Sequence, residues 1–203
     1  GVTGSNGKST VTSLLECMLA AAGIKVRAGG NLGTPALDLL SDDIDVYVLE
    51  LSSFQLERSA YLPLHAAVLL NISPDHIDHH GSLAGYSAAK QRIYAACHAA
   101  IINRDEPALA AAISAAIPQI GFSLSKPASR DWGVIDNADG QWIARGNYPV
   151  MPVERLQIAG RHNLANVLAA FALADTLDVP LDGLVTGARL FPGLPHRMQV
   201  VAR

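Results

Sequence analysis

The chain has 203 residues and a formal net charge of −3; half of its residues are hydrophobic and only 16% are charged. This composition is typical of a globular domain with a large core, and it lacks the basic excess that favours nucleic acid as a partner. No apolar run reaches the roughly 18 residues that a membrane span requires, and no secretory signal opens the sequence. Cys17 and Cys97 match no metal or redox spacing and lie in helical-looking stretches. We therefore expect two small buried side chains in a cytoplasmic protein.

The chain begins with GVTGSNGKST, which predicts a phosphate-binding loop. In the pattern G-x-x-x-x-G-K-[ST], backbone amides surround phosphate oxygens, the lysine reaches the β- and γ-phosphates, and the hydroxyl binds Mg²⁺. Gly7, Lys8 and Ser9 supply the second half, whereas Val2 occupies the place of the first glycine. The following stretch, 9–22, predicts a helix whose N-terminus would add partial positive charge beneath the phosphates. From these residues alone, a glycine-rich turn before an ordinary helix remains the alternative.

Strands and helices alternate along the rest of the chain. Short β-branched runs predict strands at 24–30, 44–51, 66–72 and 99–103, and helices are predicted at 35–41, 84–98, 106–116, 161–177 and 181–190. Between about 119 and 158 the helix signals stop, and the turn NADG separates two strand-like runs. The sequence therefore predicts an α/β fold, with a mostly parallel sheet, flanking helices and a small antiparallel β insert at about 119–158.

Polar stretches follow three of the predicted strands, at the end where open parallel sheets bind ligands. Glu50 ends an apolar strand, as a Mg²⁺-binding acid does in proteins with a phosphate loop; the alternative is a charge in solvent. Asn31, read alone, would be a turn residue. The stretch SPDHIDHH carries acids and histidines that cannot all face one metal from a short loop: Asp75, His76, Asp78, His79 and His80.

Seven motifs occur in the order, and near the spacing, of the Mur ligases of peptidoglycan synthesis: TGSNGKST, GGNLG, LELSSFQLE, SPDHIDHH, YSAAKQRIY, GRHNLANVLAA and FPGLPHRMQ. The chain resembles this family of ATP-dependent amide-forming enzymes over essentially its whole length. The family's loop begins TG-x-NGK, which accounts for Val2. The resemblance implies a P-loop NTPase-like fold, with residues 1–203 as the central ATP-binding domain. The N-terminal UDP-binding domain and the C-terminal domain of such an enzyme would lie outside this sequence.

The resemblance also implies a reaction and its catalytic residues. The motifs ELSSFQLE and LPHR are similar to those of members that add D-glutamate to UDP-N-acetylmuramoyl-L-alanine. In that reaction a carboxylate attacks the γ-phosphate of ATP, and the amine of D-glutamate then displaces phosphate from the acyl phosphate. Lys8 would neutralise the β- and γ-phosphates, and His76 would bind a second Mg²⁺ beside the γ-phosphate. Lys90 matches a lysine that is carbamylated in the family.

The same resemblance implies three sets of binding residues. The nucleotide set is Gly4, Ser5, Asn6, Gly7, Lys8, Ser9, Thr10, Asn163, Asn166 and Arg197. The metal set is Ser9, Glu50, His76 and Lys90, and the residues facing the muramoyl substrate are Asn31 and Ser52. The resemblance gives His79 and His80 no role. Read by themselves, Asn163 and Asn166 could equally be capping or surface amides, and Lys90 an exposed helical lysine.

Three other functions stay open. The first is a sister enzyme, such as the meso-diaminopimelate-adding ligase or folylpolyglutamate synthase, although ELSSFQLE argues against both. The second is a metal-dependent phosphoesterase, because DHHG at 78–81 resembles the DHH signature; here, however, SPDHI separates it from the preceding strand. The third is a nucleotide-binding module without turnover.

Overall fold

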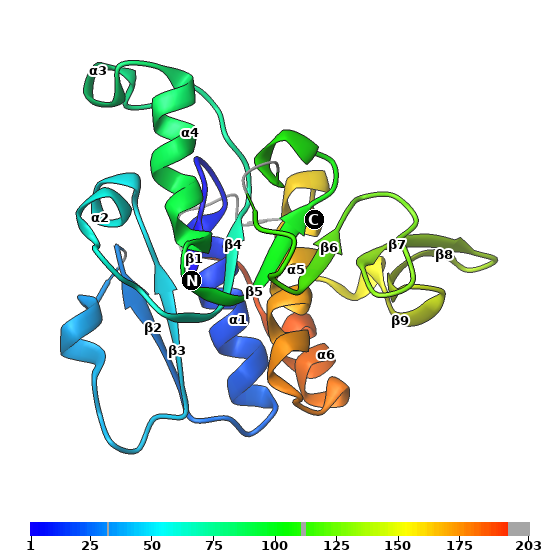
Figure 1. Ribbon diagram of the computed structural model, residues 1–203. Helices are drawn as coiled ribbons and strands as arrows, with labels where there is room; N and C mark the ends of the chain where they lie inside the picture. The colour runs from blue at the N-terminus through cyan, green and yellow to red at the C-terminus, as the bar shows by residue number, and fades with distance from the viewer. Residues whose placement is uncertain (32, 111–112, 195–203) are drawn as a thin grey trace.

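The computed structural model describes residues 1–31, 33–110 and 113–194, which form an open nine-stranded sheet with helices on both faces (Figure 1). The strands are Val2–Thr3 (β1), Val26–Gly30 (β2), Val46–Glu50 (β3), Leu64–Leu69 (β4), Cys97–Asn103 (β5), Gln119–Phe122 (β6), Trp132–Asn137 (β7), Gly140–Arg145 (β8) and Tyr148–Pro152 (β9). Their order across the sheet is β2-β3-β1-β4-β5-β6-β7-β8-β9. Neighbours from β2 to β7 pair in parallel, and β7, β8 and β9 pair antiparallel.

The helices pack on the sheet in two groups. The α-helices are Lys8–Ala21 (α1), Ser53–Arg58 (α2), Ile77–His80 (α3), Leu83–Gln91 (α4), Arg161–Ala174 (α5) and Leu181–Leu190 (α6). Short 3₁₀ turns are Ala36–Leu39 (η1), Arg92–Tyr94 (η2), Pro107–Ala110 (η3), Val153–Arg155 (η4) and Asp175–Leu177 (η5). In Figure 1, α1, α5 and α6 lie together against one face of the sheet, and α2 and α4 lie against the other.

Each face of the sheet buries its own hydrophobic core. Successive side chains of a strand point to opposite faces, so on β4 Val68 joins the core beneath α1 and α5, while Leu69 joins the core beneath α4 and η2. The first core extends to the antiparallel strands, where Trp132 stacks on Phe171 of α5 with 4.8 Å between ring centroids. None of the helices formed by the described residues is long and apolar enough to cross a lipid bilayer.

The α/β architecture and most of the predicted elements are confirmed, and the differences are local. The helix predicted at 84–98 ends at Gln91 and continues only as η2, because Ile93 and Tyr94 turn into the core and β5 begins at Cys97. Cys97 is thus a buried strand residue and not a helical one. The prediction at 35–41 corresponds to the short turn η1, and that at 106–116 corresponds to η3 as far as Ala110; residues 111 and 112 lie outside the described residues.

The antiparallel part begins later than predicted. The sequence pattern places Gln119–Phe122 in the insert, but β6 pairs in parallel with β5 from Ala100↔Gln119 to Asn103↔Phe122. Antiparallel pairing starts at Trp132, where β7 pairs with Arg145 of β8. The apolar residues of β6 suit either pairing, so the local pattern could not distinguish the two directions.

Candidate functional site

The glycine-rich loop connects the end of β1 to the start of α1. Gly7 adopts a left-handed conformation with φ 83° and caps α1, and a side chain there would overlap Oδ1 of Asn166. Within the described residues no side chain caps this helix. The amides of the first turn therefore remain available as donors for an anion at the positive end of the helix dipole.

The segment after β4 holds the loop in place. Asn71 forms paired contacts with Asn6: its Oδ1 accepts from the Asn6 amide at 2.9 Å, and its Nδ2 donates to the Asn6 carbonyl at 3.1 Å. The Ser73 amide donates to Ser5 Oγ at 2.9 Å. Sequence reasoning did not single out Asn71 or Ser73. The available signal was a short polar stretch directly after a buried strand that neighbours β1.

Lys8 and Ser9 lie at the start of α1, beside the loop. The Lys8 ammonium donates to the carbonyls of Gly4 at 3.0 Å and Ser5 at 3.3 Å, so its charge lies over the loop. Ser9 and Thr10 are both buried. The structure thus brings the seven predicted loop residues, Gly4 to Thr10, together around one backbone turn.

Glu50 is a buried carboxylate at the end of β3, directly across from Val2 of β1. Its Oε1 accepts from Asn31 Nδ2 at 2.9 Å, and the Asn31 amide also donates to the Glu50 carbonyl. Its Oε2 has no hydrogen-bond partner among the described residues. A buried carboxylate oxygen without a partner is costly, so this position fits a cation beside the phosphate loop. Asn31 orients the carboxylate.

Lys90 belongs to α4 and is buried against β1, with only 2% of its surface exposed. Its amine donates to Thr3 Oγ1 at 3.4 Å and lies 4.8 Å from the centre of the Tyr86 ring. Burial and the nearby Lys8 ammonium lower the pKa of Lys90 from its ordinary 10.5 to about 8, although the carboxylates of Asp75 and Glu50 oppose this shift. Lys8, Asp75 and Glu50 are therefore close enough for their charges to influence the pKa of Lys90.

His76 precedes and caps α3 in an unusual backbone conformation. Its φ is 49°, in the left-handed region that residues other than glycine seldom adopt. About half of its side chain is exposed, and its Nε2 lies 3.6 Å from Asp75 Oδ2. The ring packs between Phe54 and Tyr86, at 5.2 and 6.2 Å between centroids. His76 is thus held at the same edge of the sheet as the loop, with its side chain partly exposed.

A cavity of about 670 Å³ lies beside the loop, on the side of α5. Asn163 and Asn166 line it together with loop residues Asn6, Gly7 and Thr10. Further polar wall residues were not predicted from the sequence: Asn71, Asn103, Asp105, Glu106, Gln157 and His162. They come from three separate segments that only the folded sheet brings together, so the sequence held no local signal for them.

Two predicted residues remain. Ser52 caps α2 in a reciprocal capping box with Gln55, because its Oγ accepts from the Gln55 amide and the Gln55 side chain accepts from the Ser52 amide at 2.8 Å. Its hydroxyl is therefore engaged in capping the first turn of α2. Arg197 lies outside the described residues.

These features define the P-loop class of α/β proteins: a mostly parallel sheet, a glycine-rich loop leading into α1, and a buried acid at the end of β3. Within this class, residues 2–174 match the family described as the Mur ligase middle domain, and the chain belongs to that family.

Curated relatives agree with this assignment. The chain is 48% identical over 203 residues to the UDP-N-acetylmuramoylalanine–D-glutamate ligase of Nitrosococcus oceani, and 46% identical to the ligase of the same name from Chromohalobacter salexigens. The match covers 100% and 98% of this chain but only 45% and 44% of the relatives. The chain thus spans less than half the length of these enzymes.

Solved structures share the fold. MurF from Acinetobacter baumannii matches with a TM-score of 0.71 at 21% identity, over 100% of this chain and 47% of that one. The UDP-N-acetylmuramate–alanine ligase MurC from Thermotoga maritima matches with a TM-score of 0.69 at 21% identity, over 99% and 46%.

Proposed function

We propose that this chain is the ATP-binding part of an enzyme that joins D-glutamate to UDP-N-acetylmuramoyl-L-alanine through an acyl phosphate. The observation that carries the proposal is the buried Glu50 oxygen without a partner, next to a phosphate loop, in a chain 48% identical to a ligase of that name. The fold alone could not support this choice, because sister ligases share it.

The chain's own residues would bind and neutralise the triphosphate. The amides from Gly4 to Ser9 would surround the phosphate oxygens. Lys8 would exchange its contacts with the Gly4 and Ser5 carbonyls for the β- and γ-phosphates. Asn163 and Asn166 would contact the adenine side, where they line the cavity beside the loop. Arg197 would contact the nucleotide phosphates or ribose, as the family resemblance implies.

Mg²⁺ would be held by Ser9 and Glu50 at one position and by His76 with Lys90 at another. The ion would supply positive charge that draws the nucleotide phosphates and the substrate carboxylate together. Glu50 fits this role because its carboxylate is buried, oriented by Asn31 and open at Oε2. Asn31 and Ser52 would lie nearest the muramoyl substrate; Ser52 also holds the first turn of α2.

Lys90 suits the carbamate that the resemblance implies. A pKa of about 8 leaves part of the amine neutral near neutral pH. The neutral nitrogen can add to CO₂, forming an N–C bond and releasing a proton, which replaces a buried cation with an anion. Carboxylate oxygens are hard ligands of the kind that Mg²⁺ prefers.

The test uses the intact protein with ATP, Mg²⁺ and UDP-N-acetylmuramoyl-L-alanine. Each candidate acceptor is supplied in turn, and ADP and the ligated product are measured. We expect turnover with D-glutamate and none with meso-diaminopimelate or with a folate and L-glutamate. Lys8→Ala should abolish turnover, whereas the exposed Lys126→Ala should not change it. Preference for another acceptor would contradict the proposal, and so would phosphodiesterase activity that needs no nucleotide.

A further inference from the structure

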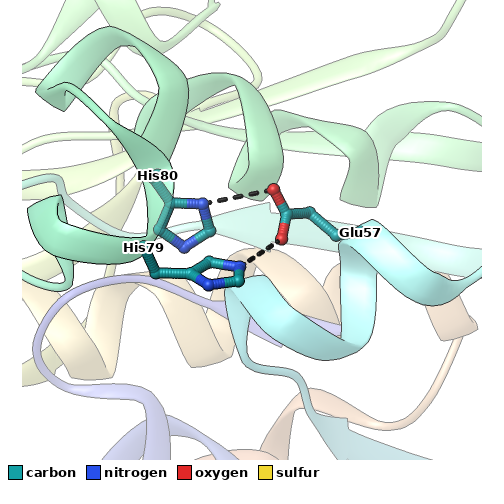
Figure 2. A group of neighbouring side chains, drawn as sticks. All are labelled: Glu57, His79 and His80. Atoms are coloured by element: carbon teal, nitrogen blue, oxygen red, sulfur yellow. Dashed lines mark hydrogen bonds and ion pairs between the residues drawn. The ribbon is translucent and has the colours of Figure 1, made fainter.

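Three side chains outside the site described above converge between α2 and α3 (Figure 2). Glu57 of α2 faces two consecutive histidines of α3. Its Oε2 lies 3.1 Å from His79 Nε2, and its Oε1 lies 3.2 Å from His80 Nδ1. One potential ligand atom from each residue lies within 4.8 Å of the other two. Two imidazoles and a carboxylate thus point at one another from two helices that are far apart in sequence.

The spacing suits a small ion with nitrogen ligands. Two ligands that each lie about 2.0–2.1 Å from a tetrahedral ion are roughly 3.4 Å apart. The nitrogen–oxygen separations, 3.1 Å to Oε2 and 3.2 Å to Oε1 of Glu57, are slightly shorter, and one ligand atom from each residue lies within 4.8 Å of the other two. A rotation of the partly exposed His79 and Glu57 side chains would therefore admit an ion between the three groups. Imidazole nitrogen favours Zn²⁺ and similar transition ions, whereas Mg²⁺ favours an all-oxygen environment.

One ligand is already oriented by a further contact. The His80 side chain is only 1% exposed, and its Nε2 lies 3.0 Å from the hydroxyl of Ser53. If Nε2 carries the proton and donates to Ser53, the Nδ1 lone pair points toward Glu57. A second hydrogen bond of this kind is what fixes metal-binding histidines in other proteins. Phe54 also packs against His79 and His80, at 4.6 and 5.5 Å between ring centroids.

We propose that Glu57, His79 and His80 form a binding site for a divalent transition ion of the Zn²⁺ type, which links α2 to α3. The side chains of Glu57 and His79 are 38% and 46% exposed, which leaves room for water as a fourth ligand. His79 and His80 lie on the short helix that His76 caps, so the ion would also fix the segment carrying His76. This inference does not rest on the proposed function.

The test measures Zn²⁺ binding to the intact protein by competition with a chromophoric chelator, with Mg²⁺ in large excess. We expect one Zn²⁺ per chain. Glu57→Gln and His79→Ala should each weaken binding by at least about tenfold, and Ser53→Ala by about ten- to a hundredfold through His80. Co²⁺ should give the visible absorption of a four-coordinate site, and this signal should disappear in His79→Ala.

Two matched controls locate the ion. His98→Ala removes an exposed histidine elsewhere, next to His65, and should leave Zn²⁺ affinity unchanged. His76→Ala should also leave it unchanged, which separates this site from the Asp75–His76 pair. Thermal unfolding of each variant verifies that it folds. Absence of Zn²⁺ binding would overturn the proposal. Binding that survives in Glu57→Gln and His79→Ala, or that is lost in His76→Ala, would do the same.

Discussion

Burying the charged amine of Lys90 is energetically unfavourable. Its amine is enclosed by Thr3 and Tyr86, and its pKa falls from 10.5 to about 8 mainly because of burial and then because of Lys8. The folded chain binds this proton more weakly than the unfolded chain does. Stability therefore rises with pH between about 8 and 10.5, and the cost of the buried cation is fully present below about pH 8.

Replacing Lys90 with methionine should accordingly stabilise the chain near neutral pH. The gain has an upper bound of about 3 kcal/mol, set by the size of the pKa shift, and it should shrink as the pH rises from about 8 toward 10.5. Urea unfolding of wild type and Lys90→Met at several pH values measures the difference. Lys126→Met is the control at an exposed lysine. A stability difference independent of pH would show that the charge is not its cause.

Glu50→Gln should weaken metal binding without lowering the stability of the fold. The glutamine oxygen can still accept from Asn31, while the buried negative charge disappears. We expect stability equal to wild type, or higher by about 1 kcal/mol, because unpaired buried charge is costly. The affinity for ATP with Mg²⁺ should fall, and high Mg²⁺ should restore part of it. Calorimetric titration at two Mg²⁺ concentrations is the measurement; a defect unaffected by Mg²⁺ would argue against a ligand role.

At the scale of elements, α1 and α6 approach closely at a glycine. A side chain on Gly187 would overlap the backbone of Met18 and lie 2.7 Å from the Cys17 carbonyl. Gly→Ala in an open helix stabilises by about 0.5–1 kcal/mol. Here we expect Gly187→Ala to destabilise by about 1–3 kcal/mol, since the two backbones must separate. Denaturant unfolding tests this, with the exposed Thr186→Ala as the control. A neutral or stabilising result would mean that the helices can move apart at little cost.

Tyr94 connects the end of the α4 segment to two strands. Its hydroxyl accepts from the Leu69 amide at 2.8 Å and donates to the Ile101 carbonyl at 2.9 Å, and the ring is buried. Tyr94→Phe should cost about 1–3 kcal/mol because the Leu69 amide would lose its partner. Thermal unfolding measures the loss. The exposed Tyr148→Phe should change stability by less than about 0.5 kcal/mol; equal effects of the two substitutions would contradict this explanation.

How well the sequence predicted each element depended on its local signals. The end of α6 at Leu190 was predicted correctly, and α1 begins one residue earlier than predicted, because amphipathic runs specify helices directly. The helix α2 was missed although Ser52 and Gln55 carry a capping-box pattern. The direction of β6 was missed because pairing depends on distant strands. The predicted roles of His76, Lys90 and Ser52 stay predictions, since they rest on resemblance.

For the whole molecule, the described residues supply a glycine-rich loop with a cavity beside it, and the related ligases are more than twice as long. We expect the 203-residue chain alone to bind ATP with Mg²⁺ weakly and to form no ligated product. Calorimetry with and without Mg²⁺ measures binding, and product analysis measures ligation. Robust ligation by the chain alone would mean that it carries the complete active site.

The placement of β1 also has a consequence for the order in which the chain folds. This two-residue strand comes first in the sequence, yet it pairs with Glu50 of β3 and Val68 of β4. Contacts between such distant residues form slowly, because a long loop must close before they are gained. The phosphate loop that follows β1 should therefore become ordered only after β3 and β4 have formed and β1 has paired between them. A nucleotide that binds this loop can recognise only chains that have completed that step, so it should protect the folded protein without accelerating its formation.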